Sequence, residues 1–135
     1  MRAARLTLIA CALALSVACG ASLIHRTALA VDQLVTVTSH LQDAEIALHD
    51  AGIISAADHR RWQESFLRIG LGTQHLVAAL RAGDGAAIQR QIRAVIDLLD
   101  ELERDQVVTL SPERQGLFRS LLVAARTTLL VMSAA

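Results

Sequence analysis

Apolar residues beyond residue 25 recur at intervals of three and four, and not in strict alternation. This period places them on one face of an α-helix, so strands are not expected. Four such stripes follow one another along the chain. They are Leu34, Val37, Leu41, Ala44, Leu48 and Ala51; Trp62, Phe66, Ile69, Thr73, Leu76 and Leu80; Ile88, Ile92, Val95, Leu99 and Leu102; and Phe118, Leu122, Ala125, Leu129 and Met132.

Capping residues mark the ends of these stripes. Gly52 and Gly83 follow the first and second stripes, where a left-handed residue commonly ends a helix. Ser55 and Asp84 are N-cap residues ahead of the second and third stripes, and Pro112 stands in the first turn of the fourth. The connections are short, which makes neighbouring helices antiparallel. We therefore predict an all-α, antiparallel up-down bundle of about four helices over residues 25–135.

The first 24 residues have the pattern of a membrane-targeting segment. Arg2 and Arg5 precede residues 6–24, which carry no charge. A stretch of this length can span a bilayer core of roughly 30 Å, although it is long for the apolar part of a secretory signal. Neither Gly nor Pro occurs between Ala21 and Ala51, so the first bundle helix is expected to be continuous with, or adjacent to, this membrane segment.

Three interpretations of this segment stay open. An uncleaved anchor would leave the basic flank in the cytoplasm and the bundle outside. Alternatively, residues 15–20 (LSVACG) resemble a bacterial lipobox, which implies lipidation at Cys19, with a departure at Ser16 where an aliphatic residue is usual. A second stretch ending at Cys11 matches the lipobox more closely but leaves only five residues between Arg5 and Cys11, too few for the apolar part of a signal. Ordinary cleavage after a small-x-small pattern is the third interpretation.

Composition narrows the function classes. All 13 basic residues are Arg, which is typical of a GC-rich genome, and we expect a bacterial source. Residues 25–135 hold 11 of these Arg and all 13 acidic residues, a net charge of −2. Aromatic residues make up 2% of the chain, so no platform for stacking bases exists. Nucleic-acid binding is therefore not expected, and the bundle itself contains no Cys.

The fourth stripe has a second interpretation. Residues 117–135 are apolar on nearly every side, interrupted by the charged Arg119 and Arg126. A membrane span is disfavoured because a central Arg costs about 2.5 to 3.5 kcal/mol. We expect instead a helix buried between bundle partners or in an oligomer interface. The candidate interaction face consists of Phe118, Leu122, Leu129 and Met132.

Five histidines are the first candidates for chemistry: His25, His40, His49, His59 and His75. Glu45 and His49 share a helix face, and His49 and His59 flank the first turn closely enough to approach each other. A zinc or iron site needs three or four converging ligands, which this spacing does not supply. We therefore expect exposed polar residues, with no metal and no cofactor.

An acidic group ends the third stripe: Asp97, Asp100, Glu101, Glu103 and Asp105. Negative charge at a helix C-terminus opposes the helix dipole and needs compensation. We expect ion pairs within the helix, Arg93 with Asp97 and Asp100 with Arg104. A docking surface for a basic partner or a cation is the alternative.

Two glycines interrupt the second stripe, Gly70 and Gly72. Close helix packing or a local kink is the expected reason, because Gly inside a helix costs about 1 kcal/mol against Ala. A hinge or a narrow ligand cleft beside Trp62 and Phe66 is the alternative. No strand precedes these glycines, so they do not form a phosphate-binding loop.

The leading functional hypothesis is a membrane-anchored envelope protein that is not an enzyme and works through helix contacts. Its partners would be the membrane through the N-terminus, and either a second copy or another envelope protein. A small-ligand or metal-binding sensor, using the interior near Trp62, Gly70, Gly72 and His75, is the alternative. No nucleophile elbow, zincin motif or paired Ser/His/Asp pattern occurs in the sequence.

Overall fold

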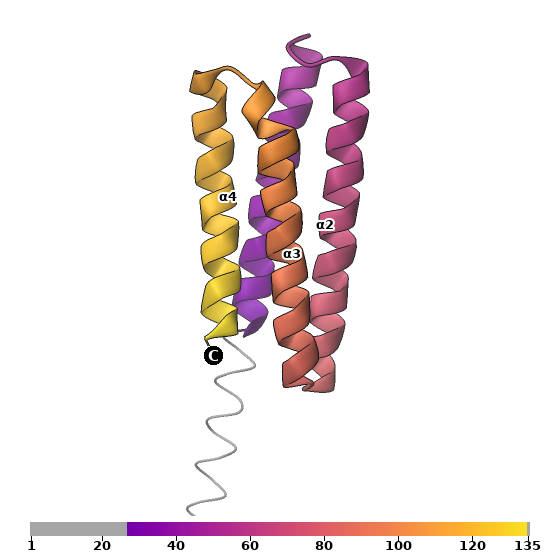
Figure 1. The fold of residues 1–135 in the computed structure, drawn as a ribbon, viewed down its shortest axis with the longest axis vertical. Coiled ribbons are helices and arrows are strands. Elements are labelled where there is room, and N and C mark those ends of the chain that lie inside the picture. Colours follow the sequence, from indigo (N-terminus) through magenta and orange to yellow (C-terminus); the bar gives the residue numbers. More distant parts are fainter. Residues whose placement is uncertain (1–26, 135) are drawn as a thin grey trace, which may run out of the picture.

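The computed structural model describes residues 27–134, which form four long helices arranged as a bundle (Figure 1). The N-terminal helix covers residues 27–50. It is followed by α2 (Ala56–Ala82), α3 (Gly85–Asp105), the short 3-10 helix η1 (Val107–Thr109) and α4 (Pro112–Ser133). The all-α class and the four helices expected from the sequence are confirmed for this part of the chain.

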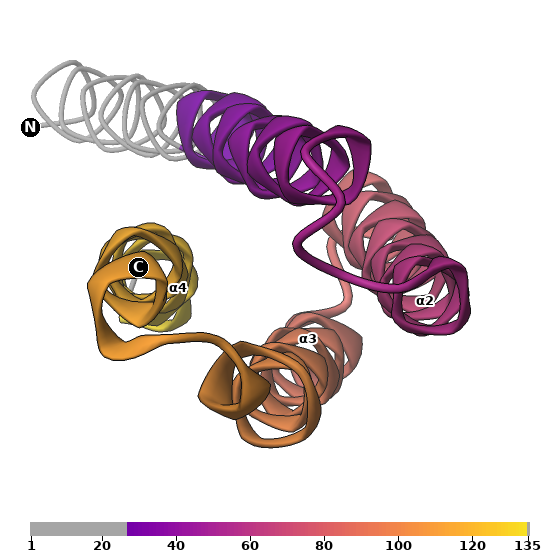
Figure 2. The ribbon, with the colours of Figure 1, turned by 90° about the horizontal axis from the view of Figure 1, so that it is seen from above.

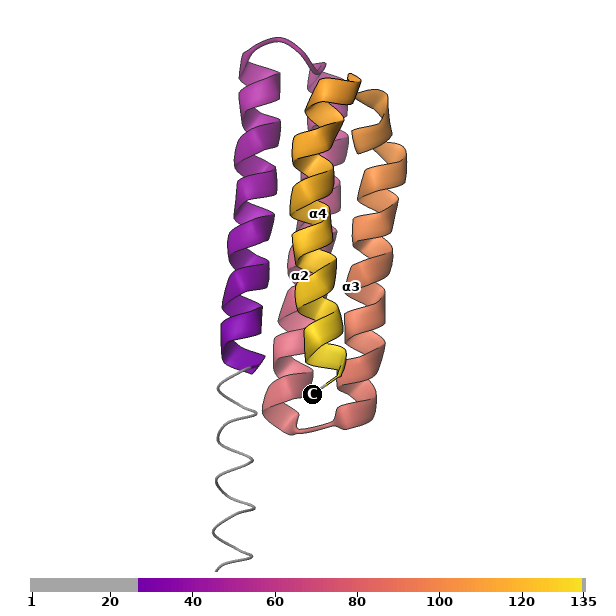
Figure 3. The same cartoon turned by 90° about the vertical axis from the view of Figure 1, so that its left-hand side faces the viewer.

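Consecutive long helices run in opposite directions, as Figures 1 and 3 show. Seen end on, the N-terminal helix lies between α2 and α4, and α3 completes the arrangement on the opposite side (Figure 2). Residue 27, the turn after α2 and the end of α4 lie at one end of the bundle, here called the proximal end. The turn at residues 51–55 and η1 lie at the other, the distal end.

The membrane segment expected over residues 1–24 lies outside the described residues. Its continuity with the N-terminal helix therefore stays a prediction. Among the described helices, α4 is long and apolar enough to cross a membrane by length and composition alone. However, one face of α4 packs into the bundle core. A helix that packs in the core of a bundle can be as long and as apolar as a membrane span, so this property is weak evidence for a span.

The core forms where the apolar stripes of the four helices meet. Most of the residues expected from the sequence are buried there, as the 3.6-residue period requires. Trp62 contacts Phe66 and Phe118, with ring centroids 5.8 Å and 5.0 Å apart, and so joins α2 to α4. The buried stripe residues are Leu34, Val37, Leu41, Trp62, Phe66, Ile69, Thr73, Leu76, Ile92, Val95, Leu99, Leu102, Phe118, Leu122, Ala125, Leu129 and Met132.

The helix ends follow the predicted capping residues. Gly52 and Gly83 have φ values of 69° and 67°, the left-handed conformation that favours glycine. The side chains of Ser55 and Asp84 each accept a hydrogen bond from the backbone amide three residues on, at 3.1 Å and 2.9 Å. Ser111 makes no such bond, and α4 begins instead with the fixed backbone of its proline.

Candidate functional site

A buried carboxylate lies at the distal end of the N-terminal helix. Glu45 follows Leu41 by four residues, so the helix places it on the same face as the core stripe. Its exposed fraction is 0%, although the charged residue types are almost never fully buried unless they are paired. Burying an unpaired carboxylate is costly, so its partners define the first candidate site.

Both oxygens of Glu45 bind side chains of α2. His59 Nδ1 lies 2.7 Å from Oε1, and Gln63 Nε2 donates to Oε2 at 2.8 Å. His59 and Gln63 are four residues apart and so project from one face of α2. The carboxylate therefore holds two successive turns of α2 against the N-terminal helix. No side-chain nitrogen or oxygen that is buried within the described structure lacks a hydrogen-bond partner.

The expected approach of His49 and His59 across the first turn is confirmed. Their rings stack with centroids 4.1 Å apart and planes inclined by 23°. His49 Nδ1 lies 3.7 Å from a carboxylate oxygen of Asp50. Within residues 27–134 no three His, Cys, Asp or Glu side chains converge as metal ligands would. The cluster of Glu45, His49, His59 and Gln63, here called the distal cluster, is therefore a joint between two helices.

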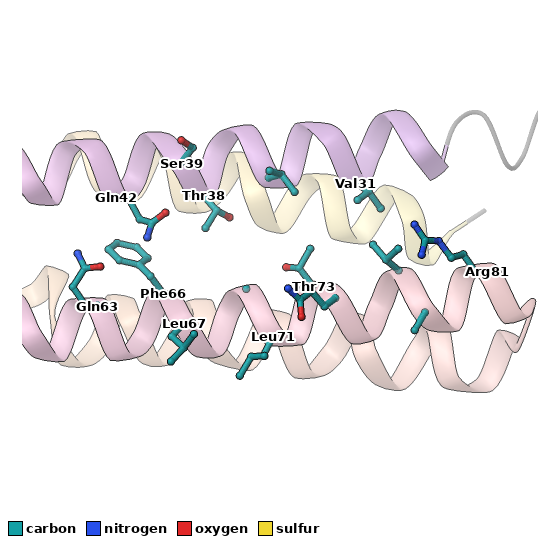
Figure 4. A pocket seen from close by; sticks show the side chains of 15 residues that line it. Val31, Thr38, Ser39, Gln42, Gln63, Phe66, Leu67, Leu71, Thr73 and Arg81 are labelled. Carbon is teal, nitrogen blue, oxygen red and sulfur yellow. The ribbon is translucent and has the colours of Figure 1, made fainter.

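A long groove runs along the bundle between the N-terminal helix and α2, from the distal cluster toward the proximal end (Figure 4). Its volume is about 850 Å³. Gln42, Gln63 and Phe66 lie at one end of it, and Val31 and Arg81 at the other (Figure 4). The remaining lining residues are Val35, Thr38, Ser39, Leu67, Gly70, Leu71, Thr73, Gln74, Val77 and Ala78. We call this surface the helix groove.

The helix groove arises from a second stripe on each of its two helices. On the N-terminal helix this stripe is Val31, Val35, Thr38 and Gln42, with steps of four, three and four. On α2 it is Gln63, Leu67, Gly70, Gln74, Val77 and Arg81, with the same alternation. At 3.6 residues per turn, each second stripe lies about a quarter turn away from the core stripe of its helix. The sequence analysis followed only the core stripes and missed this surface.

Apolar side chains in the helix groove remain open to solvent. Val35 is 53% exposed, Leu67 is 65% exposed and Leu71 is 46% exposed. Gln63 belongs both to the groove wall and to the distal cluster, because its amide is held by Glu45. The buried carboxylate thus fixes one polar side chain at the distal end of the groove.

A second apolar surface lies on α4. The expected interaction face of Phe118, Leu122, Leu129 and Met132 is corrected, because these four residues are buried in the bundle core. These four residues form the core stripe of α4, and such a stripe packs against the other helices of the same bundle. The exposed apolar residues of α4 lie on the side away from the core and are Leu117, Val123, Leu130 and Val131. With the exposed Ser120 and Thr127 they form what we call the α4 outer face.

The residues proposed for a ligand-sensing interior do not converge. Trp62 is buried in the core, and His75 is exposed on the surface of α2. A Cβ at Gly72 would lie 3.1 Å from the side chain of Val95, so this glycine permits close packing of α2 against α3. Gly70 has open space around it and lines the helix groove. Close helix packing therefore explains the glycine at position 72, whereas Gly70 lies on the surface of the helix groove.

The acidic group at the end of α3 is compensated by neighbouring helices. Arg126 on α4 donates to Asp100 at 2.7 Å and to Glu103 at 2.6 Å. On the other side, Nη2 of Arg68 on α2 donates to Glu101 at 3.0 Å. The expected i,i+4 pairs of α3 do not occur among the described ion pairs.

Two opposing effects act on the pKa of Arg126 in this network. Partial burial acts to lower the pKa of Arg126, but hydrogen bonds to Glu103 and Asp100 outweigh it, so the pKa is raised. A guanidinium held in this way stays charged at every physiological pH. The network therefore fixes α4 beside α3, and turns the α4 outer face away from the core.

The chain was compared with protein-family models, curated proteins and solved structures, and none of them matches it. Cys19, the expected lipidation site, lies outside the described residues, as do Cys11 and His25. Two apolar surfaces and one buried polar joint are thus the features of residues 27–134 from which a function can be inferred.

Proposed function

We propose that this chain is a membrane-anchored protein of the bacterial envelope, without enzymatic activity, which acts by binding a helix in the helix groove. The observation that supports this most strongly is the second stripe on each wall. Two neighbouring helices with matched steps of four and three present the knobs and holes into which a third helix packs. Helix-in-groove binding is a common mode of peptide recognition.

The length of the helix groove favours a helical occupant over a compact ligand. The groove follows α2 from Gln63 to Arg81. Eighteen residue steps at 1.5 Å each correspond to roughly 27 Å, or about five helical turns. A helix can fill such an open groove along its length, whereas small-molecule sites enclose most of the ligand surface.

The N-terminal segment supports the proposed anchoring. Residues 6–24 are uncharged and follow two Arg, and residue 27 already belongs to the N-terminal helix. The proximal end of the helix groove, at Val31, is therefore close in sequence to the anchor. An anchored bundle would present this groove beside the membrane surface, within reach of the helices of other envelope proteins.

A photo-crosslinking amino acid at position 71 tests the proposed binding. We expect covalent adducts with a protein when the full chain is expressed in a GC-rich bacterial host and irradiated in its membranes. The matched control is the same amino acid at position 108, because Val108 is similarly exposed (53%) but lies on η1, away from the groove. Adducts with lipid only, or equal yields at both positions, would contradict the proposal.

Intact mass of the membrane-extracted protein tests the anchor. Lipidation at Cys19 removes the first 18 residues and adds the mass of acyl chains, whereas an uncleaved anchor leaves the full sequence mass. Ordinary cleavage gives the shorter mass without acyl chains. Recovery of the unprocessed chain from the soluble cytoplasmic fraction would refute membrane anchoring altogether.

A further inference from the structure

The helix groove and the α4 outer face both expose apolar side chains alongside polar ones, and no described residue covers either surface. They lie on different sides of the bundle, since α2 and α4 flank the N-terminal helix (Figure 2). The groove walls use stripes with steps of four and three, and the α4 outer face has the same form. It runs through Ser120, Val123, Thr127 and Leu130, with steps of three, four and three. The α4 outer face is therefore a helix surface of the kind that the groove fits.

The two surfaces also lie at the same height along the bundle. Trp62 and Phe118 are in contact, so Gln63, where the groove begins on α2, is level with the first turns of α4. At the proximal end, the carbonyl oxygen of Ser133 accepts a hydrogen bond from Gln89, near the start of α3. α2 and α4 run in the same direction (Figure 1). Two copies standing side by side in one membrane would thus bring most of the groove level with the outer face, with the end of α4 slightly short of the turn after α2 (Figure 1).

Charge complementarity at the proximal end points to the same arrangement. α4 has no basic residue in its last turn, so no cationic side chain of its own offsets the negative end of its dipole. Arg81 lies at the proximal end of the helix groove. No carboxylate within residues 27–134 forms an ion pair with it. An α4 helix from a neighbouring copy, seated in the groove, would place its last carbonyl groups near this guanidinium.

We propose that copies of this chain associate head to tail in the plane of the membrane, with the α4 outer face of one copy in the helix groove of the next. This inference rests on the proposed helix-binding function and names a second copy as the partner. Because the two surfaces differ, the contact is heterologous. Repetition then gives a ring if the rotation closes, and an open row if it does not.

The size of the contact indicates that membrane confinement is needed. A helix of 22 residues is about 33 Å long, and a contact strip about 10 Å wide would cover on the order of 350 Å² on each copy. This is below the roughly 800 Å² per partner of standard stable interfaces. Pairs free in solution should therefore dissociate, whereas anchoring raises the effective concentration of neighbouring copies.

Disulfide crosslinking of the full chain in its native membranes tests this inference. Leu71→Cys places a thiol in the helix groove, and Thr127→Cys places one on the α4 outer face. Oxidation of the double variant should give a ladder of dimers, trimers and larger species. The parent chain, which carries Cys11 and Cys19, measures the background.

The single variants separate this arrangement from a symmetric dimer. A heterologous contact predicts that neither single variant exceeds the background, because identical positions do not meet. Strong dimerisation of one single variant, or a double variant that forms no ladder, would overturn the proposal. Mixing the two single variants in one membrane should restore dimers but give no longer ladder.

Charge substitutions give a second readout on the same ladder. Val123→Glu, on the α4 outer face, and Arg81→Glu should each lower the crosslinking yield of the double variant several-fold. The matched control is Val108→Glu, which changes a similarly exposed side chain outside both surfaces and should leave the yield unchanged. Equal yields in all three variants would contradict a role for these surfaces. Unshifted Trp62 fluorescence would show that each variant is folded.

The outcome at position 71 distinguishes the two proposals. If the photo-crosslinking residue there captures only a different protein, and the double-cysteine variant forms no ladder, self-association is refuted and helix binding stands. If position 71 captures no protein, both fail.

Discussion

The distal cluster and the α3–α4 network both join two helices through hydrogen bonds to carboxylates, but in different surroundings. Glu45 is fully buried, and its two oxygens bind His59 and Gln63. The Arg126 network lies at the surface, where Asp100 is largely exposed. Removing one partner of a buried charge is costly because water cannot replace that partner, whereas an exposed charge can be hydrated instead. The difference indicates that the distal cluster is the more sensitive of the two joints, and Gln63 connects it to the helix groove.

The largest effect is expected from His59→Ala. This substitution leaves the buried Glu45 carboxylate with Gln63 as its only described partner, and should lower the free energy of unfolding by about 2–3 kcal/mol. The fall is smaller than for a fully buried pair because His59 keeps 29% of its side chain exposed. Urea denaturation followed by the fluorescence of Trp62, the single tryptophan, measures it.

Two variants serve as controls for this prediction. His75→Ala removes an exposed imidazole from the same helix and should leave stability within about 0.5 kcal/mol of the parent. Glu45→Leu combined with His59→Ala should recover most of the loss, because no buried charge is left. A His59→Ala variant as stable as the parent would show that the buried carboxylate does not depend on its partners.

A smaller effect is expected from Arg126→Ala. Two ion pairs with α3 are lost at a partly exposed site, so stability should fall by about 1 kcal/mol. Part of this difference should disappear in 1 M salt, because exposed charges are screened. Arg104→Ala, which removes only a pair with the neighbouring Asp105, is the matched control and should change little. If Arg126→Ala lowered the free energy of unfolding as much as His59→Ala, the surface network would be as sensitive as the buried cluster, and the prediction would be wrong.

The smallest effect is a pH dependence at the start of α2. A hydrogen bond from the Ser55 hydroxyl lowers the pKa of Asp58, and Arg61 adds to this. A depressed folded-state pKa contributes stability above the ordinary value of about 3.9, and this stability is lost as the pH falls through the folded-state pKa. The unfolding midpoint of Asp58→Asn should therefore fall less than that of the parent below about pH 4. If the unfolding midpoints of the two proteins fell equally with pH, the proposed stabilisation of the Asp58 carboxylate by Ser55 would be wrong.

The core and the caps were predictable from the sequence because both depend on local periods and local hydrogen bonds. Leu34, Phe66 and Leu129 are buried where their stripes place them. Glu45 was missed as a core residue, although it stands four residues after Leu41 on the same stripe. A charged residue at a core position was the available signal. Its partners on α2 could not be identified without the turn geometry.

Long-range pairings account for most of the remaining errors. Asp100 pairs with Arg126, 26 residues away, and not with Arg104 on its own helix. The sequence shows which residues share one helix face, but not which helix lies opposite that face. For the same reason the apolar residues of α4 could be assigned to an interface before it was known which of them the bundle itself buries.

Residue 27, the first described residue of the N-terminal helix, and the end of α4 both lie at the proximal end, because an even number of antiparallel helices returns the chain to the side from which it came. The fold is therefore suited to circular permutation. A short linker could join Ser133 to residue 27, and new termini could be opened at Gly52 in the distal turn. An anchor attached at these termini would hold the same bundle inverted, with its groove reversed relative to the membrane. The orientation of the bundle relative to the membrane could then be changed while its core contacts stay the same.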